Sequence, residues 1–195
     1  MKTIHERLDI LEAKMRSEHF RENTGWGNEI GYYVFDYEPE DELVVRQRID
    51  ELSSTDTEMK FGYELIVYDL YELMIQLLKE EDAFDELLAL EEEEGSEYIY
   101  DAISDILKFD EPDSLMVNYI ADKQHTPDDA VVLLTGVGKC FPIIRSHKIL
   151  NNLHQVMDPC PVIMFFPGAY DWNQHPIFGD LKDDNSYRSF PIVER

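Results

Sequence analysis

Two uninterrupted apolar runs in the second half of the chain constrain its fold more than any other feature. AVVLLT spans residues 130–135 and PVIMFF spans residues 161–166, and neither alternates with polar residues. Strands of this kind are covered on both faces, as in parallel sheets. The segments near residues 31–36 and 64–68 predict two further strands. A short fifth strand is expected near residue 190, at a sheet edge, because Pro191 has no N–H to donate.

Helical patterns separate these strands. The spacing i, i+4, i+7 and i+11 predicts a first amphipathic helix whose apolar stripe is Ile4, Leu8, Leu11 and Met15. Pro39 and Pro142 are each predicted to open a helix, because the first turn does not need the missing N–H. Asp69 and Glu72 have the spacing of a capping box. The alternation predicts an α/β fold: a mainly parallel sheet of about five strands with helices on both faces. We expect P-loop-like or RecA-like layering without a functional phosphate loop.

The chain length and the distribution of charge predict one domain with an acidic insertion. A chain of 195 residues fits a single α/β domain, 1–195. Within it, residues 70–126 read as an acidic helical insertion. Residues 80–129 hold 18 Asp and Glu against two lysines, whereas residues 130–195 hold six residues of each sign.

The net charge and the cysteines limit the class of protein. With 42 acidic against 17 basic residues, the formal net charge is −25. A field of this sign repels a phosphate backbone and argues against direct nucleic-acid binding. No apolar run reaches the roughly 18 residues of a membrane span. Cys140 and Cys160 fit buried thiols in a reducing compartment, so we expect a soluble, cytoplasmic protein.

The segment VVLLTGVGKC, residues 131–140, resembles part of a phosphate-binding loop. Such a loop has glycine, four residues and then Gly-Lys-Ser or Gly-Lys-Thr, so that backbone N–H groups wrap the phosphates and the hydroxyl meets magnesium. Counting back from Lys139 places Leu133 at the first glycine, and Cys140 replaces the hydroxyl residue. We therefore expect a tight strand-to-helix turn, with nucleotide binding as the alternative.

Other catalytic patterns are weak. The strand ends are predicted to present Asp36, Asp69, Thr135 with Gly136, and Pro167 with Gly168, where α/β folds gather ligands. His147 and His154 are two helical turns apart, too far for one metal ion without further ligands. Nucleophile motifs such as Gly-x-Ser-x-Gly are absent from the sequence. We expect no catalytic residue, no metal and no cofactor.

The segment 166–190 is rich in aromatic residues and lacks a helical or alternating pattern. Aromatic residues and arginine dominate binding energy at protein interfaces. The candidates for partner binding are Tyr170, Trp172, His175, Phe178, Tyr187 and Arg188. The alternative is a loop folded over the sheet edge whose aromatic side chains complete the core.

Four segments together resemble the BrxB family, a small component of the bacteriophage-exclusion (BREX) defence systems of bacteria. They are GNEIGYYVFDYEPEDEL (27–43), LTGVGKCFPIIRSHKILNNL (134–153), FFPGAYD (165–171) and LKDDNSYRSF (181–190). The resemblance implies membership of an antiphage apparatus that also contains a methyltransferase, a large ATPase and PglZ, an alkaline-phosphatase-like protein. It provides no catalytic residues to carry over.

The resemblance and the residues together favour a noncatalytic adaptor that binds another BREX protein, with PglZ as the preferred partner. One alternative is a degenerate nucleotide-binding protein or enzyme. A second alternative is a DNA mimic, in which the acidic helices imitate a phosphate array. The sequence does not predict an oligomeric state.

Overall fold

The protein is built around a five-stranded sheet. The computed structural model describes residues 2–17, 20, 31–109, 111, 113–122, 130–156, 160–170 and 189–195, without the side chain of His147. The strands are β1 (Tyr32–Tyr37), β2 (Glu64–Asp69), β3 (Ala130–Thr135), β4 (Val162–Pro167) and β5 (Ser189–Pro191). Their order is β2-β3-β4-β1-β5, and neighbouring strands pair in parallel throughout. The prediction of an α/β fold with about five strands is therefore confirmed.

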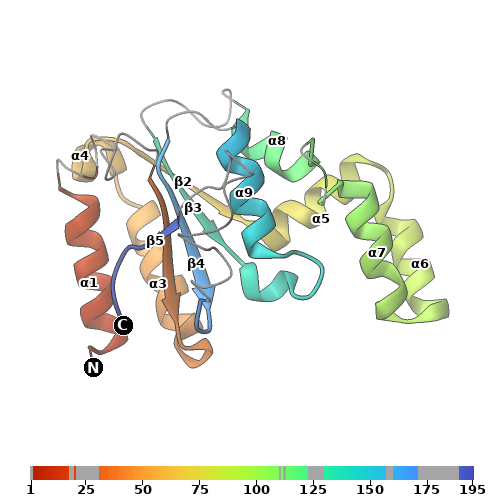
Figure 1. The fold of residues 1–195 in the computed structure, drawn as a ribbon, viewed down its shortest axis with the longest axis horizontal. Helices are drawn as coiled ribbons and strands as arrows, with labels where there is room; N and C mark the ends of the chain where they lie inside the picture. The colour runs from red at the N-terminus through yellow and green to blue at the C-terminus, as the bar shows by residue number, and fades with distance from the viewer. Residues whose placement is uncertain are drawn as a thin grey trace, which may run out of the picture.

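Successive side chains of the central strands enter two separate cores, because a strand alternates between its faces. Val132, Leu134 and Met164 belong to one core, whereas Leu133 and Ile163 belong to the other. All five side chains are fully buried. The apolar runs at 130–135 and 161–166 lack polar alternation because both faces of β3 and β4 are covered. Figure 1 shows helices on both sides of the sheet.

One face is covered by α1 (Ile4–Met15), α3 (Glu42–Ser53) and α4 (Thr57–Phe61). Leu8, Leu11 and Met15 of the predicted stripe are buried, and Ile4 packs at its margin. Thr3 and Glu6 cap the N-terminus of α1 with reciprocal hydrogen bonds. Pro39, predicted to open a helix, opens the 3-10 helix η1 (Pro39–Asp41), and η1 leads directly into α3.

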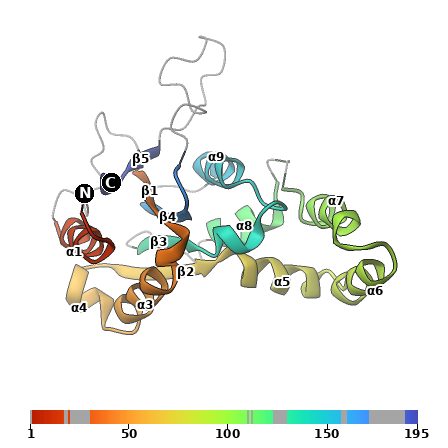
Figure 2. The same cartoon turned by 90° about the horizontal axis from the view of Figure 1, so that it is seen from below.

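The other face is covered by α5 (Leu70–Glu80), α8 (Leu115–Ala121) and α9 (Ser146–Val156). Between α5 and α8 the chain forms α6 (Phe84–Glu94) and α7 (Ser96–Leu107), which pack against each other and against α5. In Figures 1 and 2 this pair extends away from the sheet, at the opposite end of the molecule from α1. We call residues 70–122 the helical module.

The prediction that Pro142 opens a helix is wrong. After β3 the chain forms a 3-10 turn, η2 (Val137–Cys140), and a cis Phe141–Pro142 peptide, and α9 begins only at Ser146. Proline disfavours helical backbone at the preceding residue, and Phe141 accordingly has φ −70° and ψ 136°. Turns and a bend occupy residues 141–144, so the helix starts beyond the proline.

The short strand β5 lies at the sheet edge, as predicted, and Pro191 pairs with Val34. The residues that follow it run beside α1, where Lys14 Nζ donates to the carbonyl of Ile192 at 2.7 Å. None of the helices in the part of the chain described above is long and apolar enough to cross a membrane.

Candidate functional site

The carboxyl ends of the parallel strands form one edge of the sheet, which is where α/β folds place ligands. Asp36 of β1 and Asp69 of β2 lie at this edge, together with Gly136 after β3 and Gly168 after β4. The sequence predicts these four residues at this edge of the sheet. The two carboxylates belong to separate clusters of contacts.

Asp36 is the centre of a buried cluster. Arg7 Nη2 donates to its Oδ1 at 3.2 Å, and Arg195 Nε donates to its Oδ2 at 3.0 Å. The backbone N–H of Tyr170 also donates to Oδ2, at 3.4 Å. Asp36 thereby connects α1, β1, the turn after β4 and residue 195, and both of its oxygens hold the fold together.

The two arginines extend this cluster across the sheet edge. Arg7 Nη2 also donates to the carbonyl of Val193, and its guanidinium lies 4.8 Å from the centre of the Phe35 ring. Arg195 contacts Glu38 and the carbonyl of Gly168. Neither arginine is predicted from the sequence as a partner of Asp36. They lie 29 and 159 residues from Asp36, so no local spacing connects them to it.

Asp69 has two roles at the start of α5. Its Oδ1 accepts from the backbone N–H groups of Tyr71 and Glu72, which confirms that Asp69 caps the helix. Its Oδ2 accepts from Lys139 Nζ at 2.6 Å, and that ammonium also lies 3.8 Å from Glu72 Oε1. Lys139, the lysine of the phosphate-loop-like segment, therefore lies between two carboxylates.

The glycines of this turn allow close packing. Gly136 has φ +73°, in the left-handed region that favours glycine, and a Cβ there would lie 2.2 Å from Asp69 Oδ1. A Cβ on Gly138 would lie 2.8 Å from the Pro167 ring. Leu133, which takes the place of the first phosphate-loop glycine, is buried inside β3. The tight turn predicted after β3 is confirmed, although a 3-10 turn follows it directly.

Both cysteines are buried, as predicted. Burial raises the pKa of the Cys140 thiol to about 12, and the charge of Asp69 adds to this shift. The Cys160 thiol donates to the carbonyl of Ala130 at 2.7 Å. At neutral pH Cys140 is therefore a protonated thiol rather than a thiolate nucleophile.

The predicted interaction residues fall mostly outside the described residues. Trp172, His175, Phe178, Tyr187 and Arg188 lie there, and their role stays a prediction. Tyr170 is 7% exposed, and its ring meets that of Phe166 edge-on at 5.3 Å. For Tyr170 this burial agrees with the alternative in which the loop aromatics complete the core.

His154 is one of the two histidines considered above as metal ligands. His154 of α9 packs its ring 5.3 Å from the ring of Tyr32. Among the residues that the structure describes, no group of three or more His, Cys, Asp or Glu is arranged to hold a metal ion.

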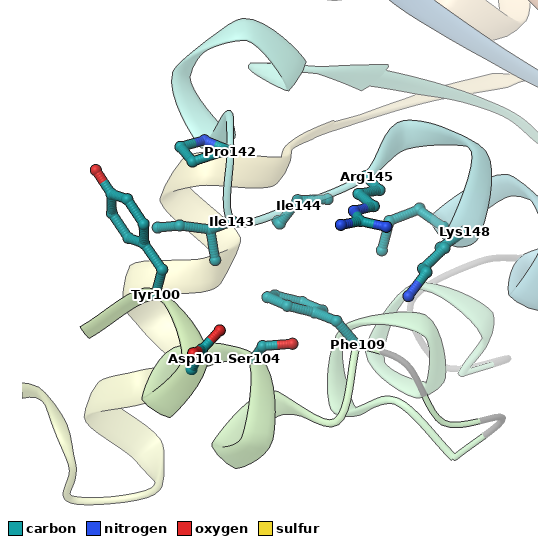
Figure 3. A pocket seen from close by; sticks show the side chains of 10 residues that line it. Tyr100, Asp101, Ser104, Phe109, Pro142, Ile143, Ile144, Arg145 and Lys148 are labelled. Atoms are coloured by element: carbon teal, nitrogen blue, oxygen red, sulfur yellow. The ribbon is translucent and has the colours of Figure 1, made fainter. Parts of the chain in front are cut away.

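A polar hollow of about 150 Å³ lies where the helical module meets the segment before α9. In Figure 3, Arg145 and Lys148 lie on one side of it, and Asp101 and Ser104 of α7 lie on another, with Phe109 between them. Within the described part of the chain, no carboxylate lies within ion-pair distance of Arg145. The hollow presents charges of both signs.

A second, larger hollow of about 270 Å³ lies between α5, α6 and α7, and we call it the module groove. Its lining is mostly apolar, with Glu91 and Ser96 as polar members. Tyr100 and Ile143 line both hollows, so the two adjoin. Neither hollow could be predicted from the sequence, because each is formed by side chains from several separate segments.

Comparison with known proteins identifies the family. The family model described as "BREX protein BrxB" matches residues 66–192. A BREX protein BrxB from Bacillus cereus (strain H3081.97) is 43% identical over 198 residues, and the alignment covers 100% of both chains. The chain belongs to the BrxB family. A BREX protein BrxB from Escherichia coli O9:H4 (strain HS) is 29% identical over 188 residues, covering 96% of this chain and 90% of that protein.

Membership of the BrxB family makes the chain a component of the BREX phage-defence system. The resemblance stated from the sequence is confirmed over the full length of the chain. No solved structure matches this BrxB-family chain.

Proposed function

We propose that this BrxB-family protein is a noncatalytic adaptor of the BREX system. It binds another BREX protein in the cytoplasm and positions or regulates it, and PglZ is the preferred partner. The proposal assigns it no catalytic residue and no cofactor.

The observation that carries this proposal is that both carboxylates at the sheet edge are bound by other groups of the same chain. Asp36 is held by two arginines of the same chain, and Asp69 caps α5 while it accepts from Lys139. A general base or a metal ligand needs a carboxylate oxygen directed at its substrate or ion. These oxygens are instead directed at the protein itself, which supports a structural role.

We also propose that the fold has P-loop-like or RecA-like layering and lacks a functional phosphate loop. The layers of helix, parallel sheet and helix support it. The turn after β3 supports the loss of phosphate binding, because Lys139 is paired with Asp69 and Leu133 lies inside the strand.

Exposed apolar side chains support a role in protein binding. Leu88 of α6, Tyr98 of α7 and Phe141 before α9 are all exposed. Single exposed apolar residues are common, but Leu88 also lines the module groove. Trp172 and Tyr187 of the aromatic segment complete the set of interaction candidates.

The test is a pairwise co-purification and size-exclusion screen against every other protein of the same BREX system. We expect one stable complex, with PglZ as the first candidate. Trp172→Ala and Tyr187→Ala are expected to weaken it by about 30-fold or more if they are interface hot spots. Lys2→Ala, at an exposed position before α1, is the control. Failure of the wild-type protein to bind any BREX protein rejects the adaptor proposal.

A second candidate, a DNA mimic that occupies a nucleic-acid groove of its partner, is favoured by the end of α6. Glu92, Glu93 and Glu94 are exposed at the carboxyl end of that helix, where the helix dipole disfavours negative charge. Negative charge at this position destabilises the helix, which suggests that these glutamates serve in binding rather than in stability. Replacing Glu91–Glu94 by glutamine should weaken partner binding and flatten its dependence on salt. An unchanged salt dependence rejects this candidate.

A further inference from the structure

The module groove is an apolar hollow whose floor is buried and whose rim is partly exposed. Met74 and Leu78 of α5, Phe84 and Leu87 of α6, and Ile99 of α7 line it. Leu88 also lines it and is 45% exposed. Leu88, with the partly exposed Ile75 and Phe84, remains in contact with water, and a partner that covers this rim gains free energy from its burial.

The size and shape of the groove indicate what it accommodates. Its volume of about 270 Å³ lies just below the roughly 300–1,000 Å³ of small-molecule sites, so it suits a few side chains better than a whole cofactor. Its walls are helices, and side chains of a further helix fit between the ridges of such a surface. One end carries a hydrogen bond from Ser96 Oγ to Glu91 Oε1, at 2.7 Å.

The charge around the groove is strongly negative. Residues 70–122 contain 17 Asp and Glu and two lysines, which gives a net charge of −15. Both lysines have local contacts, since Lys108 pairs with Asp113 at 2.7 Å and Lys79 lies 4.9 Å from the centre of the Phe84 ring. The field outside the groove therefore attracts a positively charged partner.

We propose that the module groove binds a basic amphipathic helix of a partner protein. Apolar side chains at i, i+3 or i+4, and i+7 of that helix enter the groove, as in other helix-in-groove complexes. Its lysines and arginines face the glutamates of α6. This inference rests on the proposed adaptor function and names the chemistry of one surface that the partner contacts.

Charge disfavours the occupants that this chain itself could provide. A second copy of this chain carries the same net charge of −25 and is repelled. None of the stretches outside the described residues is net basic in sequence, so the chain itself does not provide the positive segment. A basic segment of a different protein is the occupant that fits both the apolar lining and the negative surround.

The first test uses a synthetic helical peptide, so that it does not depend on knowing the partner. The probe is a fluorescent Leu/Lys peptide with leucines at i, i+3, i+4 and i+7, and its controls are a scrambled peptide and a version with Glu for Lys. We expect saturable binding of the Leu/Lys helix alone, weakened between 50 and about 200 mM salt. Equal binding of the scrambled peptide overturns the proposal, because it shows attraction by charge without a groove.

Substitutions test whether the peptide binds in the module groove. Leu88→Asp and Leu88→Ala should reduce peptide affinity by about tenfold or more, because a buried leucine contact is lost. Leu43→Asp is the matched control, since Leu43 is 74% exposed on α3, on the opposite face of the sheet from the helical module. Circular dichroism checks that each variant folds. Equal losses in the Leu88 and Leu43 variants overturn the proposal.

The same variants in the BREX interaction screen separate the two proposals. If a partner binds wild type, Leu88→Asp and Leu43→Asp equally well, the groove inference fails and the adaptor function stands. If wild type binds the peptide but no BREX protein, the groove is real and the adaptor function fails. If Leu88→Asp loses partner binding and Leu43→Asp keeps it, the result supports both the adaptor function and the groove inference.

Discussion

Lys139 and Asp69, 70 residues apart in the chain, form an ion pair with 2.6 Å between Nζ and Oδ2. The pair ties the turn after β3 to the start of α5, and the ammonium also faces the ring of Tyr71 at 5.6 Å. A phosphate-loop lysine has to reach a phosphate. Here the lysine instead joins two neighbouring strand ends.

The role of this pair is measurable with Lys139→Ala. We expect no saturable micromolar binding of magnesium ATP to wild type or variant by isothermal titration. We also expect the variant to lose about 1 kcal/mol of unfolding free energy in urea, since the pair is partly exposed. Lys2→Ala should leave stability unchanged. Saturable ATP binding that Lys139→Ala abolishes contradicts the structural role.

Asp36 is expected to contribute more to stability than the outer arginine that binds it. Asp36→Ala leaves Arg7, which is nearly buried, without its carboxylate, and breaking a buried pair costs about 3–5 kcal/mol. Arg195→Ala should cost about 1 kcal/mol, because the side chain of Arg195 is 34% exposed. Urea unfolding followed by circular dichroism measures both. Equal losses in the two variants contradict this ranking.

Glu12 should make stability depend on pH in the acid range. Burial raises its pKa, but hydrogen bonds from Lys60 and Arg16 outweigh that effect and lower the pKa below 4.5. As the pH falls below this value, the unfolded chain takes up a proton before the folded protein does, so the stabilisation disappears.

The comparison of wild type with Glu12→Gln isolates this effect. We expect a difference of about 1 kcal/mol in unfolding free energy that is constant from pH 7 to about 5 and shrinks below about pH 4.5. Glu64→Gln, at an exposed position of β2, serves as control. A difference that does not change with pH shows that Glu12 acts through packing instead.

The two cysteines should be unreactive in the folded protein. Burial raises the pKa of Cys140 to about 12, and Cys160 is covered as well as bonded to the carbonyl of Ala130. Ellman's reagent at pH 8 should therefore detect no thiol in native protein and two in concentrated urea. Rapid reaction of one native thiol indicates that the core around it opens.

Elements whose signal lies within a few residues could be predicted from the sequence. The stripe of Leu8, Leu11 and Met15, the cap at Asp69 and the edge position of Pro191 each depend on neighbours in the chain. The predicted start of α9 was wrong by four residues, because turns and a bend occupy residues 141–144 and the helix begins only at Ser146.

The candidate site was only partly predictable. The sequence placed Asp36, Asp69 and Gly136 at the carboxyl edge, because parallel strands all end there. It did not identify Arg7 or Arg195 as their partners, nor the groove between α5, α6 and α7. An ion pair between distant residues leaves no periodic signal in the chain.

By itself, the sequence determined the fold class, the buried strands, the acidic character of the helical module and membership of the BrxB family. The tertiary structure alone decided that Asp36 and Lys139 are engaged by residues of the same chain, and that α5, α6 and α7 leave an apolar groove open. The reason is physical. Hydrogen bonding and burial within a helix or strand repeat over a few residues, whereas contacts between elements depend on how the whole chain packs.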